Sequence, residues 1–224
     1  MEINEAYKNI DRSYYLTNGD SDFSRISEII NYLSCFQVGE VKQYEFCDTY
    51  YETPENFLKE LDATIRVRQM PNTQTLSIVC KNLGERREFE MEMKHGSKIQ
   101  DKTEYILFLE DKIQDIYTRR IDVDVVRALN KLKPFLKIYT KRKACDIIDN
   151  REFKAEVDFD LTRIETKRHV ETLHILEVKN RCYFTNENEK SFERFVKEIE
   201  KKVVMIPMGE RKLDAGLRVF KREW

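Results

Sequence analysis

Alternation of apolar and polar residues is the dominant pattern along this chain, and it predicts a protein rich in β-strands. Ile65 and Val67 alternate with Arg66 and Arg68, and this strand spacing sends both guanidinium groups to one side. Similar alternation follows at residues 75–81, where Leu76, Ile78 and Cys80 share one face. Further strands are predicted at 9–16, 40–51, 86–93, 137–147, 153–164 and 170–184.

Helical spacing of apolar residues predicts helices between these strands. The four apolar sets are Ile26, Ile29, Ile30 and Leu33; Ile106, Leu109, Ile113 and Ile116; Val126, Leu129 and Leu132; and Phe192, Phe195, Val196 and Ile199. Six glycines and four prolines leave little room for linkers, so a single domain over residues 1–224 is expected.

The predicted strands have one charged and one apolar face, which allows two interpretations. An ordinary sheet turns its charged face to water, whereas a closed sheet with a charged lumen covers its apolar outer face with helices. Periodicity does not distinguish the two interpretations. However, each strand carries charges of mainly one sign, whereas a solvated face usually mixes both signs because like charges on neighbouring positions repel. The basic positions are Arg66, Arg68, Lys81, Lys141 and Lys143, and the acidic ones are Glu88, Glu90, Glu92, Glu156, Asp158 and Asp160. This segregation suits a site for a polyanion with a divalent metal ion.

The overall charge argues against a generally basic nucleic-acid binder, because 40 Lys and Arg residues nearly cancel 41 Asp and Glu residues. The five cysteines are widely spaced and form no metal-binding pair, which indicates reduced thiols and a cytoplasmic location. No apolar run is long enough for a membrane span or a signal peptide, so no membrane partner is expected. The oligomeric state stays open.

Several short motifs resemble the triphosphate tunnel superfamily, which joins CYTH proteins and VTC polyphosphate polymerase domains. The run Asp48-Thr49-Tyr50, the pair Arg66-x-Arg68 and the strand ending at Lys81 are similar to the CYTH pattern, as is Arg86-x-Glu88-x-Glu90. Leu176-Glu177-Val178-Lys179 resembles the L-E-V-K strand of VTC domains, and the Arg211-Lys212-Leu213 run with Gly216 resembles their ending. The resemblance covers nearly the whole chain.

The resemblance implies an α+β fold, in which an eight-stranded antiparallel barrel forms a charged tunnel with helices outside. A triphosphate or polyphosphate would bind in the lumen, with an RNA 5′-triphosphate end as a further candidate. The implied phosphate-binding residues are Arg66, Arg68, Lys81, Arg86, Lys141, Lys143, Lys179 and Lys212. Asp11, Glu88, Glu90, Asp158 and Glu177 would hold Mg²⁺ or Mn²⁺. No general base is identified; Glu88 and Glu156 are candidates by location alone.

The first strand departs from the family signature E-x-E-x-K, because Asn9-x-Asp11-x-Ser13 stands in its place, and the alternative register Glu2-x-Asn4-x-Ala6 departs from it equally. A metal-binding carboxylate and the signature lysine are therefore missing. Three functions stay open: a metal-dependent phosphohydrolase or phosphotransferase, a non-catalytic phosphate-binding tunnel, and a VTC-like polyphosphate polymerase domain. A fourth interpretation is a β-rich protein whose charges are all solvated.

Overall fold

The computed structural model describes residues 11–17, 28, 36–82, 85–117, 124–149, 154–165, 170–181, 186–209 and 212–221. The predicted helix with Ile26, Ile29, Ile30 and Leu33 lies outside this part of the chain. Within it, no helix is both long and apolar enough to cross a membrane.

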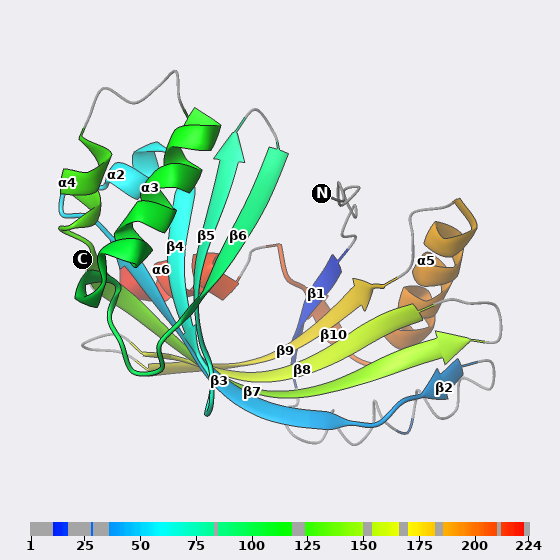
Figure 1. The fold of residues 1–224 in the computed structure, drawn as a ribbon. Coiled ribbons are helices and arrows are strands. Elements are labelled where there is room, and N and C mark those ends of the chain that lie inside the picture. Colours follow the sequence, from blue (N-terminus) through cyan, green and yellow to red (C-terminus); the bar gives the residue numbers. More distant parts are fainter. Residues whose placement is uncertain are drawn as a thin grey trace. The chain divides into compact units, whose positions relative to one another are not determined.

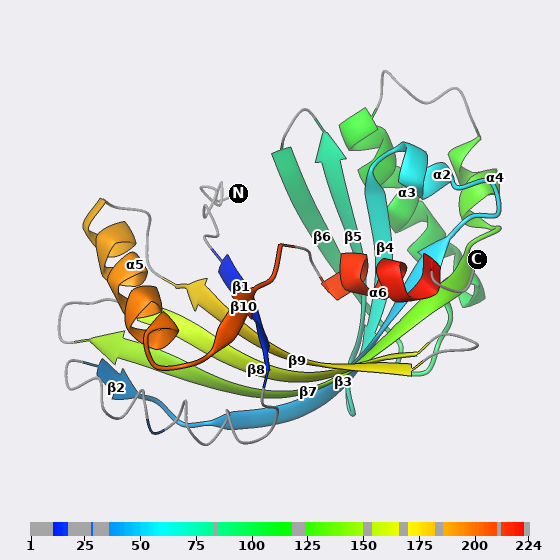
Figure 2. The same cartoon turned by 180° about the vertical axis from the view of Figure 1, so that it is seen from behind.

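Strands predominate among the described elements, and the helices follow between them in the order of the chain (Figures 1 and 2). The strands are β1 Asp11–Leu16, β2 Phe36–Val38, β3 Lys42–Glu52, β4 Ala63–Gln69, β5 Gln74–Asn82, β6 Glu85–Met93, β7 Lys133–Asp149, β8 Lys154–Glu165, β9 Val170–Asn180 and β10 Met205–Pro207. The helices are α2 Phe57–Glu60, a 3-10 turn Ile99–Asp101, α3 Thr103–Tyr117, α4 Val125–Leu129, α5 Asn186–Glu200 and α6 Lys212–Lys221.

The strands pair in the order β10-β1-β9-β8-β7-β3-β4-β5-β6, and β2 pairs with β7. The predicted antiparallel sheet with helices is confirmed, but the expected count of eight strands is corrected to ten in the described part of the chain. Two of the ten, β2 and β10, have three residues each, which is too short for alternation to reveal them. The hydrogen-bonded order of the described strands also has two ends, so it does not close as the expected barrel would.

The chain divides into two compact units. Unit 1 comprises residues 1–44, 140–163 and 171–215, and unit 2 comprises residues 45–139, 164–170 and 216–224. Each unit is assembled from segments that are far apart in the sequence, and each has its own hydrophobic core. The expectation of a single domain over residues 1–224 stays a prediction.

In unit 2, the alternating residues of β4, β5 and β6 form the core as predicted. Ile65 is fully buried opposite Ile78, and Leu76 lies opposite Met91. Helix α3 adds Ile106, Leu109 and Ile113 to the same core, together with the buried rings of Tyr105 and Tyr117. Each such side chain stabilises the fold by roughly 1.5–3 kcal/mol through burial.

In unit 1, helix α5 packs on the apolar face of the strands (Figure 1). The four predicted residues of its inner face, Phe192, Phe195, Val196 and Ile199, are at most 2% exposed. They pack with Val157 of β8 and with Leu176 and Val178 of β9. Because side chains alternate along a strand, the charged residues between these apolar ones belong to the opposite face of the sheet.

Candidate functional site

The charged face of β8 is buried, which distinguishes it from a solvated face. Asp158 is 0% exposed and Asp160 is 3% exposed. Buried charges need partners, since an isolated charge in a poorly solvated place costs several kcal/mol. Their partners come from β7, β9 and α6 of the same unit. We call the set Arg142, Glu156, Asp158, Asp160, Glu177, Lys179, Arg181 and Lys212 the unit 1 cluster.

Arg142 of β7 is at the centre of the unit 1 cluster. Its Nε and Nη2 atoms donate to the two carboxylate oxygens of Asp160, at 2.7 and 2.6 Å. Nη2 also lies 3.0 Å from Glu177 Oε2, and Nη1 pairs with Asp158. Burial would lower the pKa of Arg142, but the hydrogen bonds that Arg142 donates to Asp160 and the negative charge of the three carboxylates outweigh burial and raise the pKa. Arg142 therefore stays charged, in the two-pronged geometry that guanidinium groups also use for phosphate.

Lys179 of β9 lies among three carboxylates. Its Nζ is 2.9 Å from Glu156 Oε1 and 3.9 Å from Glu177 Oε2, and it also donates to Asp158. Burial alone would lower the pKa of Lys179, yet the surrounding carboxylates raise it. The ammonium group is therefore a fixed positive charge.

Lys212, in the first turn of α6, adds a further cation to the unit 1 cluster. Its Nζ lies 2.7 Å from Glu177 Oε1 and also pairs with Asp160. Glu177 consequently contacts Arg142, Lys179 and Lys212 at once. This carboxylate, the one that survives in the L-E-V-K motif, connects three cations of unit 1.

Asp158 is the least satisfied member of the unit 1 cluster. Its Oδ2 accepts from Lys179 and pairs with Arg142, whereas its buried Oδ1 has no hydrogen-bond partner among the described residues. Burial raises the pKa of Asp158 to about 6, against the lowering effect of Arg142 and Lys179. The group therefore titrates close to neutral pH.

Unit 2 has a second charged face, built by cross-strand pairing. Arg66 of β4 lies opposite Tyr50 of β3 and Ser77 of β5, and Ser77 lies opposite Glu90 of β6. Side chains in such a row are close enough to interact directly. We call Asp48, Arg66, Arg68, Ser77, Glu88 and Glu90 the unit 2 row.

Arg66 uses only part of its donor capacity within the unit 2 row. Its Nη2 lies 3.1 Å from Glu88 Oε1, 3.5 Å from Glu90 Oε1 and 3.2 Å from Ser77 Oγ. Its buried Nε donor has no partner among the described residues. A buried donor of this kind costs roughly 1–3 kcal/mol until an acceptor reaches it.

Arg68, by contrast, is held firmly in place. Its Nε and Nη2 each donate to a different oxygen of Asp48 at 2.8 Å, and its guanidinium lies 4.2 Å above the Phe46 ring centre. Asp48 is 5% exposed. The Asp48-Thr49-Tyr50 motif therefore orients an arginine of the neighbouring strand.

The remaining predicted site residues are placed less centrally. Lys81 lies near the end of β5, and its Nζ is 4.0 Å from Asp62 Oδ1. Lys141 is exposed, and Lys141 and Lys143 alternate with the buried Arg142, so they belong to the other face of β7. Asp11 of β1 pairs across the sheet with Lys179. Arg86 lies opposite Lys81 in the backbone pairing, and its side chain lies outside the described part.

Arg142 and Asp160 belong to the unit 1 cluster but were not among the predicted site residues. The basic run Lys141-Arg142-Lys143 was assigned to the face of its two lysines. The position of Arg142 in β7 is the signal that places it in this cluster. Ile138 and Thr140 lie four and two residues before Arg142, so all three share one face of the strand, and all three are buried. Asp160 likewise shares one face of β8 with Asp158, because the two are two residues apart on the strand.

A family model described as the CYTH domain matches residues 20–201. The chain belongs to the CYTH family. The match spans 182 of the 224 residues and includes most of both units. No curated protein sequence matches the chain.

Solved structures with similar folds support the CYTH assignment. A protein from Hippeastrum, assigned as an adenylyl cyclase and described as having a dominant triphosphatase activity, matches with a TM-score of 0.62 and 14% identity, over 94% of this chain and 95% of that one. A Bacillus halodurans protein assigned as an adenylate cyclase gives 0.51 and 16%, over 92% and 96%. A Pyrococcus horikoshii protein gives 0.50 and 16%, over 94% and 98%. At these identities the likeness shows a shared fold.

The carboxylates of this CYTH chain do not fit a divalent metal ion as they are arranged. Among the residues that the structure describes, no group of three His, Cys, Asp or Glu side chains is placed to hold one. In the unit 1 cluster, Glu156, Asp158, Asp160 and Glu177 are each paired with at least two cations. A metal ion would have to displace those cations to reach the oxygens.

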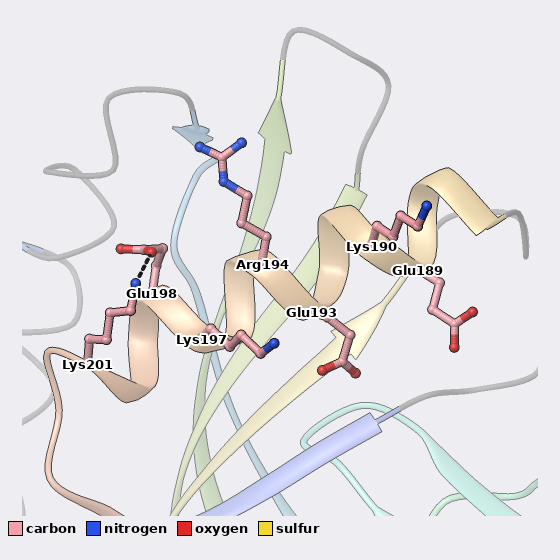
Figure 3. A pocket seen from close by; sticks show the side chains of 7 residues that line it. All are labelled: Glu189, Lys190, Glu193, Arg194, Lys197, Glu198 and Lys201. Atoms are coloured by element: carbon pink, nitrogen blue, oxygen red, sulfur yellow. Dashed lines mark hydrogen bonds and ion pairs between the residues drawn. The ribbon is translucent and has the colours of Figure 1, made fainter.

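A hollow beside α5 carries none of this chemistry. All seven residues that line it, Glu189, Lys190, Glu193, Arg194, Lys197, Glu198 and Lys201, come from α5 and the turn after it (Figure 3). Their charges are of both signs, and Lys201 pairs with Glu198 at 2.6 Å. A surface of this kind is an ordinary solvated helix face, so we assign no site to it.

Proposed function

We propose that the chain binds a triphosphate or polyphosphate group through the cations of the unit 2 row and hydrolyses it. The observation that carries this proposal is Arg66, beside the firmly held Arg68: the buried Nε donor of Arg66 has no acceptor among the residues that the structure describes. Phosphate oxygens are strong acceptors for guanidinium donors. Membership in the CYTH family, and a triphosphatase activity attributed to one protein of similar fold, support the same class of ligand.

A phosphate would enter the unit 2 row by exchange with carboxylates. The side chains of Glu88 and Glu90, which contact Arg66, are 29% and 56% exposed. They can turn toward water when a phosphate takes their place, because solvent then satisfies their charge. Since Arg66 is already mostly buried, the exchange adds little desolvation cost. The carboxylates thus act as removable counter-ions for the arginine.

In the proposed reaction, fixed cations neutralise charge as it moves onto the leaving phosphate. Arg66 and Arg68 of the unit 2 row fill this role. Mg²⁺ or Mn²⁺ would accompany the substrate, because a divalent ion is usually bound largely by substrate phosphates and water. We also propose a cytoplasmic location, consistent with the free thiols of Cys47, Cys80 and Cys145.

Glu156 is a poor general base despite its location. Burial would raise the pKa of Glu156, but hydrogen bonds and charge from Lys179 and Arg181 lower it to about 2. A group with such a low pKa seldom accepts a proton at neutral pH. Glu88, which lies 3.1 Å from Arg66 Nη2, stays a candidate by location.

A non-catalytic phosphate-binding protein is the second candidate function. The pairing of all four carboxylates of the unit 1 cluster with cations favours it, since no group of three or more metal-ligating side chains among the described residues is placed to hold a catalytic metal ion. The altered first-strand signature at Asn9, Asp11 and Ser13 favours it as well. VTC-like polymerisation remains an outcome that the experiment below also detects.

Binding and turnover of tripolyphosphate test these proposals together. Titration calorimetry should give binding to the wild-type protein that Arg66→Ala weakens about tenfold or more, the loss expected for a charge-assisted contact. Arg194→Ala, which removes an exposed arginine of α5, is the matched control and should leave the affinity unchanged. Absence of tripolyphosphate binding by the folded wild-type protein would refute both candidate functions.

Turnover then separates the candidates. Tripolyphosphate, ATP and a 5′-triphosphate RNA are incubated with the protein and Mg²⁺ or Mn²⁺, and released phosphate and polyphosphate are measured. Phosphate release that Arg66→Ala abolishes supports the hydrolase. Binding without release supports the non-catalytic protein, and polyphosphate made from ATP indicates a polymerase.

A further inference from the structure

Lys179 lies where three carboxylates from two strands converge. Glu156 and Asp158 come from β8, and Glu177 is two residues before Lys179 on β9. The ammonium nitrogen lies within 4 Å of an oxygen of each of them. Converging carboxylates supply the oxygen ligands that hard divalent ions such as Mg²⁺ and Ca²⁺ prefer.

We propose that the ammonium of Lys179 takes the place of a divalent cation in this carboxylate triad, so that unit 1 holds no metal ion of its own. Lys179 has a side chain that is only 15% exposed, and the Asp158 side chain is fully buried. The lysine is therefore an internal part of the triad. The inference concerns the chain without ligand, and it holds whether or not the proposed triphosphate is the substrate.

The distances argue against an added ion beside the lysine. Mg²⁺ requires oxygens at about 2.0–2.1 Å, whereas Lys179 keeps Glu156 at 2.9 Å and Glu177 at 3.9 Å. A metal ion would also approach Arg142 and Lys212, which share the oxygens of Glu177. Repulsion between such close, poorly solvated cations is strong.

The charge balance leads to the same conclusion. The unit 1 cluster has four carboxylates and four cations, so it is already neutral. The four carboxylates are Glu156, Asp158, Asp160 and Glu177, and the four cations are Arg142, Lys179, Arg181 and Lys212. An added divalent ion would leave an excess positive charge in a buried place. Removal of Lys179 would instead leave the triad with uncompensated negative charge, in addition to the Asp158 Oδ1 that already lacks a partner among the described residues.

Binding of Mn²⁺ to the protein without phosphate tests this proposal. The free ion is followed by electron paramagnetic resonance, and titration calorimetry gives the dissociation constant. We expect no saturable site in the wild-type protein. The Lys179→Gln variant should gain one site, with affinity at least about tenfold above any wild-type binding. Adding Asp158→Asn to Lys179→Gln should abolish that site.

Arg181→Gln is the matched control, because it removes a cation that also pairs with Glu156, at 2.9 Å, but leaves Lys179 in place. It should gain no Mn²⁺ site. Circular dichroism establishes that each variant is folded, and Lys179→Ala replaces Lys179→Gln if the latter is not.

Two results would overturn the proposal. One is a saturable Mn²⁺ site in the wild-type protein that Asp158→Asn removes, which can be measured without any lysine variant. The other is a folded Lys179 variant with no gain in Mn²⁺ affinity. Since no phosphate is present, either result leaves the tripolyphosphate test of the proposed function untouched, and the two proposals can fail separately.

Discussion

Asp158 shows how strongly a strand position changes the chemistry of one residue. Alternation along β8 turns Asp158 and Asp160 away from the apolar core, but both are still buried. Asp160 accepts hydrogen bonds from Nε and Nη2 of Arg142. Burial would raise the pKa of Asp160, but these hydrogen bonds and the positive charge of Lys212 outweigh burial and lower it. Asp158 has one oxygen without a partner among the described residues, and burial is the largest effect on its pKa, which it raises. Two aspartates two positions apart therefore titrate in opposite directions from their ordinary value.

This difference predicts a pH dependence that Asp158→Asn should remove. The pKa of Asp158 is raised to about 6 in the folded protein, so the folded state binds more protons than the unfolded chain between about pH 4 and 6. The contribution of Asp158 to the free energy of unfolding is therefore present at low pH and lost as pH rises through 6. We expect wild-type stability to fall by roughly 1–3 kcal/mol relative to Asp158→Asn between pH 4 and 7. Urea unfolding at both pH values measures this, and a constant difference would contradict it.

At the scale of elements, amphipathic strands and helices were predictable because burial follows their periodicity. The inner face of α5 and the core faces of β4 and β5 agree with the prediction. Helix α6 shows what periodicity leaves out. Its Gly216 lies against β7, and a Cβ atom there would come within 2.6 Å of Leu136 Cδ2 and 3.3 Å of Ile138 Cδ1. The glycine is needed for this close approach, and only the packed structure reveals the neighbour.

Gly216→Ala should therefore destabilise the protein, although alanine is the better helix former. Helix propensity favours alanine by about 1 kcal/mol, but overpacking costs about 1–3 kcal/mol, and Leu136, at 2% exposed, has little room to move. We expect a net loss of about 1 kcal/mol in urea unfolding. Gly209→Ala is the matched control, since no atom lies within 4 Å of the added Cβ. An increase in the free energy of unfolding of Gly216→Ala would contradict this prediction and show that the Leu136 side chain moves to make room for the added methyl group.

At the scale of the whole molecule, two hydrophobic cores stabilise the chain, one in each compact unit. The cores share no residue: that of unit 1 lies under α5, and that of unit 2 lies between α3 and the β4–β6 strands. Substitutions in sites with no common partner usually have additive effects on stability. The division therefore has a measurable consequence.

Ile65→Val in unit 2 and Ile199→Val in unit 1 should each cost about 0.5–1.5 kcal/mol, and the double variant should lose their sum. Both side chains are fully buried. The matched comparison is Ile65→Val with Ile78→Val, since these residues face each other across β4 and β5, and their effects should deviate from the sum by about 0.5 kcal/mol or more. Urea unfolding of all variants measures both couplings. Strong coupling between Ile65 and Ile199 would contradict the independence of the two cores.

The sequence by itself determined the longer strands, their apolar faces, the helices α3 and α5 and the family resemblance, because each depends on local spacing. Arg66, Arg68, Lys179 and Glu177 could be singled out in this way. The tertiary structure decided that the opposite face of β8 is buried, that Arg142 rather than Lys141 joins it, and that Lys179 lies within a carboxylate triad. A period of two residues says which side chains share a face. It does not say which cation meets which carboxylate, because that depends on strand pairing and on what the rest of the chain places against the face.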